Sequence, residues 1–111
     1  MERISFEGIG EVMATFEAEE NVKAGQVVKV SGNGTAAPCA AGDRPAGVAA
    51  AVKNGCAAVQ VRGFATVPAT GVGIGWAKLS ADGSGGMAAD ENGADYLVVQ
   101  ADGEGAAVVL L

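Results

Sequence analysis

Short runs of small apolar residues, separated by turn residues at intervals of about 8 to 12 positions, constrain the fold of this chain most strongly. Residues 26–31 form the clearest run, and Asn33-Gly34 follows it closely. Asn-Gly readily adopts the positive φ angles of tight hairpin turns, so this pair and Asn54-Gly55 each predict a hairpin. No long helical pattern alternates with the runs, which disfavours a parallel α/β sheet. We therefore expect an all-β fold, a small β-barrel or sandwich of short strands.

The longest predicted strand covers residues 56–67 and shows the clearest alternation. Gly63 is expected to mark a bulge or bend in it, and Pro68 is expected to end it because proline has no N–H to donate to a neighbouring strand. The predicted strands are 26–31, 35–39, 46–52, 56–67, 76–80, 87–89, 96–101 and 106–111.

The first twenty residues differ from the rest of the chain because they combine bulky apolar side chains with charged ones. Ile4 and Phe6 alternate with polar neighbours, which is the period of a strand. Residues 11–20 fit either a short amphipathic helix or a strand, and we favour extended structure. The sequence thus predicts an extended N-terminal arm over residues 1–20 and a compact β domain over residues 21–111.

The apolar half of the composition is mostly Ala and Val, and the chain has one Trp, one Tyr and three Phe. Small side chains bury little surface each, and buried apolar surface contributes roughly 25 cal/mol per Å². The core is therefore expected to be thin, and self-association is expected to add stability to the folded subunit. Trp76, the single tryptophan, is expected in this core, with contact to a partner as the alternative because Trp is enriched among interface anchors.

The charge and the missing histidine exclude several classes of function. A net charge of −6, with seven unclustered Lys and Arg residues, disfavours binding to nucleic acid and to anionic membranes. Histidine is the usual general base, the usual activator of Ser or Cys nucleophiles and the commonest metal ligand, and this chain has none. We therefore expect neither catalysis nor a cofactor.

The two cysteines, Cys39 and Cys56, are expected to be small buried thiols, with a disulfide between them as the alternative. The first residues lack the basic and apolar stretches of a signal peptide, and no run approaches about 18 uninterrupted apolar residues. These patterns favour an intracellular, reducing environment.

Three segments invite a ligand-binding interpretation and are better explained as turns. The glycines of residues 71–75 do not have the GxGxxG spacing of a dinucleotide loop, and no helix is expected after them. Residues 82–85 and 90–95 contain oxygen ligands suited to Ca²⁺, but not at EF-hand spacing. Asp, Asn and Gly are also the ordinary residues of turns, so no metal site is expected.

From Val22 onward the order of short motifs is similar to that of a known protein family. The motifs are Val22-Lys23-Ala24-Gly25-Gln26-Val27-Val28, Ala46-Gly47-Val48-Ala49, Val61-Arg62-Gly63-Phe64-Ala65-Thr66-Val67-Pro68, Ile74-Gly75-Trp76 and Gly105-Ala106-Ala107-Val108-Val109-Leu110-Leu111. In this order the chain resembles the capsid decoration (cement) proteins of tailed bacteriophages and their prophage relatives. Gly73-Ile74-Gly75 stands where that family often has a Gly-Asp pair.

The resemblance implies a virion structural protein that binds the outer capsid, made in the bacterial cytoplasm. The implied partners are the major capsid protein and further copies of the chain, as a homotrimer, and no catalytic residue is implied. We expect Ile4, Phe6 and Ile9 of the arm to contact the capsid, because an extended arm can add a strand to an exposed sheet edge. The alternatives are another virion module, of the tail or a head fibre, and a carrier or ligand-binding domain. A carrier would use Lys53, which precedes a predicted hairpin tip.

Overall fold

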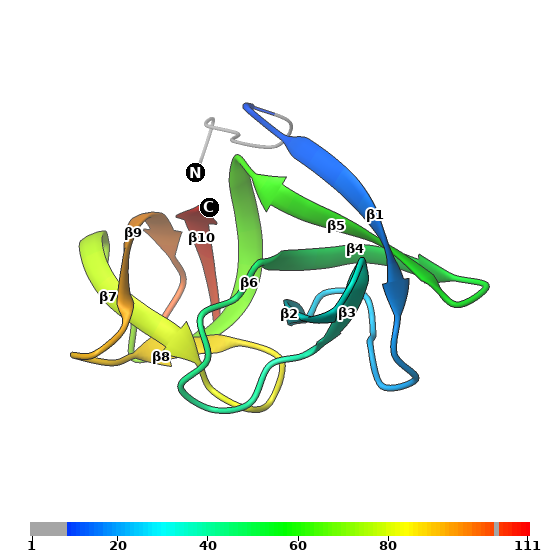
Figure 1. The fold of residues 1–111 in the computed structure, drawn as a ribbon. Helices are drawn as coiled ribbons and strands as arrows, with labels where there is room; N and C mark the ends of the chain where they lie inside the picture. Colours follow the sequence, from blue (N-terminus) through cyan, green and yellow to red (C-terminus); the bar gives the residue numbers. More distant parts are fainter. Residues whose placement is uncertain (1–8, 104) are drawn as a thin grey trace.

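The computed structural model describes residues 9–103 and 105–111, and in these ranges the chain forms ten β-strands (Figure 1). The strands are β1 (Val12–Ala18), β2 (Val27–Gly32), β3 (Thr35–Pro38), β4 (Gly47–Lys53), β5 (Cys56–Arg62), β6 (Phe64–Thr70), β7 (Gly75–Ala81), β8 (Met87–Ala89), β9 (Ala94–Ala101) and β10 (Ala106–Leu110). Over the same residues, no helix is both long and apolar enough to cross a membrane. The predicted all-β fold is confirmed, as two small closed barrels.

The first barrel contains the strands in the order β1-β3-β2-β4-β5. β1 is antiparallel to β5 and parallel to β3, and the other neighbours are antiparallel. The extended structure predicted for residues 11–20 is confirmed, because Val12–Ala18 forms β1. Part of the segment that we grouped as an arm, residues 1–20, therefore contributes a strand to the first barrel, and residues 1–8 lie outside the described part of the chain.

The second barrel repeats the connectivity of the first, with the strands in the order β6-β8-β7-β9-β10. β6 is antiparallel to β10 and parallel to β8, as β1 is to β5 and β3, and the remaining neighbours are again antiparallel. The molecule thus contains the same five-stranded arrangement twice. The sequence patterns above do not predict it, because the shared signals are short. Ala14-Thr15 of β1 matches Ala65-Thr66 of β6, and Val22 and Gly25 precede β2 as Val72 and Gly75 lead into β7.

Gly63 is the single residue between the two barrels along the chain, because β5 ends at Arg62 and β6 begins at Phe64. It adopts a φ of +95°, which confirms the predicted bend and turns the expected single strand over residues 56–67 into two strands of different barrels. A second junction joins the barrels through their backbones. The Gly42 N–H donates to the Ala81 carbonyl and the Ala81 N–H donates to the Asp43 carbonyl, each at 2.9 Å.

The prediction that Pro68 ends a strand is wrong, because β6 continues through it to Thr70. The Ala69 N–H donates to the Gly105 carbonyl on the β10 side. Successive N–H groups point to opposite sides of a strand, so the missing N–H of Pro68 faces the β8 side, where pairing begins only at Ala69. Proline therefore costs no ladder hydrogen bond at this position.

The cores are built from small side chains, as expected. The largest fully buried side chains are Leu79, Met87 and six valines. One cluster fills the second barrel and includes Val27, Cys39 and Val48 of the first, so the two barrels share apolar packing. A smaller cluster around Val28 and Val59 fills the first barrel.

The two Asn-Gly pairs form different turns. Asn54 and Gly55 have φ values of 53° and 77°, the positive pair predicted for a tight hairpin turn between β4 and β5. At the other pair only Gly34 is positive, at 63°, and the β2–β3 register shifts between Val30 and Gly32. The Asn33-Gly34 turn thus combines one positive φ with a bulge in β2, whereas the Asn54-Gly55 turn has two positive φ angles.

Candidate interaction surface

Trp76 lies on the surface, so the prediction that it packs in the core is wrong. It is 72% exposed on β7, and Ile74, two residues earlier, is 74% exposed. The alternation of β7 explains this, because Leu79 points into the second barrel while Trp76 and Lys78 are exposed. A tryptophan that is mostly exposed fits the alternative that we kept open, contact with a partner.

A second group of exposed apolar side chains lies where the described chain begins. Ile9 is 54% exposed, Val12 51% and Met13 41%. Val12 and Met13 are adjacent in β1, and both are exposed at a register shift against β5. Of the three residues predicted to contact the capsid, Ile9 is therefore on the surface, while Ile4 and Phe6 lie outside the described residues.

A row of apolar side chains crosses the outer face of the second barrel. The strand registers place Trp76 of β7 opposite Leu97 of β9, Leu97 opposite Leu110 of β10, and Leu110 opposite Phe64 of β6. We call these four residues the apolar ladder. Side chains directly opposite on neighbouring strands have Cβ atoms about 4.5–5.5 Å apart, so the four form one continuous strip.

The ladder is separate from the core on the inner face of the same strands. Phe64, Leu97 and Leu110 are half-buried, whereas their neighbours Ala65 and Val98 are buried. None of the four ladder residues belongs to the core cluster of the second barrel. Strand alternation in the sequence could have placed each of them outward, but only the registers show that they are aligned.

One end of the ladder meets the beginning of the described chain. Gly63 directly precedes Phe64 and lies against Gly10 and Glu11: a Cβ atom at Gly63 would lie 2.8 Å from the Cα and N atoms of Glu11. The Leu111 N–H donates to the Gly63 carbonyl at 2.9 Å. Figure 1 shows the start of β1, the start of β6 and the end of β10 at the same end of the molecule.

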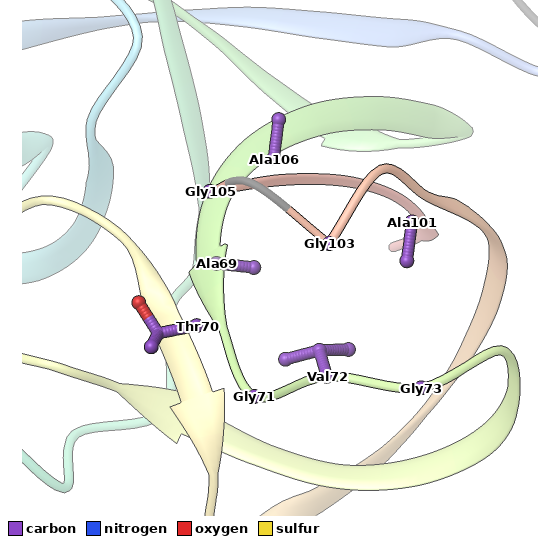
Figure 2. Close-up of a pocket in the computed structure, with 9 residues that line it drawn as sticks. All are labelled: Ala69, Thr70, Gly71, Val72, Gly73, Ala101, Gly103, Gly105 and Ala106. Atoms are coloured by element: carbon purple, nitrogen blue, oxygen red, sulfur yellow. The ribbon is translucent and has the colours of Figure 1, made fainter.

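A cavity of about 520 Å³ opens at one end of the second barrel. Residues 69–73 line one side, and Ala101, Gly103, Gly105 and Ala106 line the other. Figure 2 shows that these side chains are short, with Val72 among the largest. Among the lining residues that the structure describes, none is titratable, and residues 71–73 of the glycine loop form a small, uncharged part of the wall.

In the turns at residues 82–85 and 90–95, backbone N–H groups donate hydrogen bonds to the aspartate that begins the turn. Asp82 accepts hydrogen bonds from the N–H groups of Ser84 and Gly86, and Asp90 accepts one from the Asn92 N–H. The Asn92 N–H and the Ser80 hydroxyl hold the pKa of Asp90 below its usual value. Within residues 9–103 and 105–111, no three His, Cys, Asp or Glu side chains gather in a group that could hold a metal ion.

The two cysteines are both free and have different environments. Cys39 is buried as predicted, whereas Cys56 is exposed, so the prediction of a second buried thiol is wrong. Cys56 follows the Asn54-Gly55 turn at the start of β5, where its side chain faces solvent. The pKa of Cys39 is raised to about 11, chiefly by burial and also by the nearby Asp43, while Lys29 opposes the rise.

We expect a maleimide to modify Cys56 much faster than Cys39 in the native protein, because the thiolate is the nucleophile and Cys39 is both buried and held in its thiol form. Mass spectrometry of peptides from briefly labelled native protein measures the two rates. Labelling in denaturant, where both thiols are accessible, is the control. Equal rates in the native protein would contradict the placement of Cys39 in the core.

No protein-family model matches the chain, and no curated protein matches it.

Proposed function

We propose that the chain is a non-catalytic structural protein of a tailed-phage or prophage virion, which decorates the outer capsid and stabilises it by binding the major capsid protein. The order of sequence motifs supports this proposal. The structural observation that favours a binding role is the pair Ile74 and Trp76, which are 74% and 72% exposed. Exposed apolar groups of this kind are typical of protein–protein contacts, and Trp is the side chain most enriched at their centres.

The exposed apolar side chains at the start of the described chain support the same role. Ile9, Val12 and Met13 lead from β1 towards residues 1–8, which carry Ile4 and Phe6. An extended segment with apolar residues at alternate positions is suited to adding a strand to a sheet edge of the capsid. The net charge of −6 keeps a densely displayed protein soluble.

Co-sedimentation with capsids tests the proposal. The capsids are those of the phage or prophage whose genome carries the gene, and the protein is expected to bind them saturably and raise their temperature of disruption. Replacing Trp76 with Ser is expected to weaken binding at least about tenfold, which corresponds to about 1.4 kcal/mol. Val30→Ser is the matched control, because Val30 is a 54% exposed apolar residue of the first barrel.

The result that would overturn the proposal is a folded wild-type protein that does not sediment with these capsids. Binding to isolated tails or head fibres in place of capsids would favour the alternative virion module. Equal affinity of the Trp76→Ser and Val30→Ser variants would keep the binding role but remove Trp76 from the contact.

The carrier alternative depends on Lys53, which is exposed at the end of β4, directly before the Asn54-Gly55 turn. A carrier lysine would bear a covalent group, so the intact mass of native protein distinguishes the two functions. We expect an unmodified mass, together with a sedimentation mass of three times the 10.8 kDa chain, as for a homotrimer. A modified Lys53 would favour the carrier.

A further inference from the structure

We propose that the apolar ladder binds the chain's own N-terminal segment, residues 1–8, in the free protein, chiefly over Phe64, Leu110 and Leu97 and ending at Trp76. The proposal goes beyond the capsid role and does not depend on it. It rests on where the segment starts, how far it can reach and which side chains it carries.

The starting point is set by the close contact at Gly63. The backbone of Gly10 and Glu11 lies directly against Gly63, and the first ladder residue, Phe64, follows Gly63 in the chain. The described part of the chain therefore begins beside one end of the ladder.

The length of the segment matches the ladder. The four strands that carry the ladder are each about 4.8 Å from the next, so the row is about 14 Å long. Eight extended residues span about 26 Å, which is more than the segment needs to reach Trp76. A strand-like path across the ladder is therefore within its reach.

The side chains of the segment match the ladder in chemistry. Ile4 and Phe6 are separated by one residue, so in an extended segment they face the same way, while Arg3, Ser5 and Glu7 face the other. The apolar side can lie on the ladder and the charged side can remain in water. This arrangement removes apolar surface of both partners from water, which is the driving force of the contact.

The proposal assigns the ladder to an intramolecular partner, and this distinguishes it from contact with a second copy. A tethered segment is present at a fixed, high effective concentration, so its contact does not depend on protein concentration. A contact between copies weakens on dilution.

Trp76 is a built-in reporter because it is the only tryptophan and lies at the far end of the ladder. We compare the acrylamide quenching and emission maximum of the wild type with those of an Ile4→Ser/Phe6→Ser double variant, without capsids and over a wide range of dilution. The double variant is expected to show a red-shifted emission and about a doubling of the quenching constant at every concentration. Ser5→Ala, on the opposite face of the segment, is the matched control and is expected to match the wild type.

A second measurement is independent of the altered apolar residues. A nitroxide is attached at Ser5→Cys in a Cys56→Ser background, where the remaining Cys39 is buried. It is expected to broaden the methyl signals of Leu97 and Leu110, and to leave those of Val52 in the β4–β5 hairpin sharp.

Unchanged quenching in the double variant, or equal broadening of Leu97 and Val52, would overturn the proposal. Protection of Trp76 that disappears on dilution would also overturn it, and would assign the ladder to contact between copies. Because all of these measurements use the free protein, their failure is separate from a failure to bind capsids.

Discussion

Replacing Gly63 with Ala is expected to destabilise the protein by about 3 kcal/mol, because the new methyl group meets two penalties at once. The φ of +95° is strained for any residue with a Cβ atom. In addition, the Cβ would lie 2.8 Å from backbone atoms of Gly10 and Glu11, which cannot rotate away as a side chain could. Urea unfolding followed by far-ultraviolet circular dichroism measures the change in the free energy of unfolding.

Gly34→Ala is the matched control for Gly63→Ala. Gly34 also has a positive φ, of 63°, but a Cβ there would have no atom within 4 Å. Its substitution is expected to cost only the backbone strain, about 1 kcal/mol. Equal losses in the two variants would show that the contact between Gly63 and the Gly10–Glu11 backbone does not contribute to the free energy of unfolding. They would also remove this contact as the starting point that we infer for the N-terminal segment.

Replacing Leu79 with Ala is expected to cost about 3 kcal/mol, because it removes the largest kind of aliphatic side chain from a core made mostly of Ala and Val. Leu79 is 0% exposed on β7 and belongs to the cluster that contains residues of both barrels. Few large side chains surround it, so the cavity has few neighbours that can fill it. Denaturant unfolding measures the loss, and we expect a single transition because the barrels share this cluster.

Leu97→Ala offers the same chemical change outside the core. Leu97 is half-buried on the outer face of β9 and is not part of the core cluster. Its substitution is expected to cost about 1 kcal/mol, since less surface is re-exposed and no enclosed cavity forms. A loss at Leu97 as large as at Leu79 would contradict the division of β9 into a core face and an outer ladder.

Strand positions could be predicted well from the sequence because they depend on local patterns. The turn at Asn54-Gly55 and the bend at Gly63 follow from backbone preferences that a residue carries wherever it stands. The wrong prediction that Pro68 ends a strand arose because the effect of a missing N–H is not local: it depends on whether the neighbouring strand pairs at that position. The errors at Trp76 and Cys56 also concern which side of a strand faces the core, and composition alone does not decide that.

The residues of the proposed binding surface were predicted only in part. Ile9 was named as an apolar residue of the arm, and Trp76, the single tryptophan, only as an alternative to core packing; both are exposed. Phe64, Leu97 and Leu110 were not, because each is an ordinary apolar residue of a strand until the registers of β6, β10 and β9 align it with the others.

The sequence by itself determined an all-β chain of short strands with a core of small side chains, because alternation, turn residues and side-chain volume act over a few neighbouring positions. Only the tertiary structure decided that the strands close into two barrels of the same connectivity, that a single residue, Gly63, separates them along the chain, and that four separate apolar residues form one ladder. These features depend on hydrogen bonds between strands far apart in the chain, and such pairings are selected by the packing of the whole molecule.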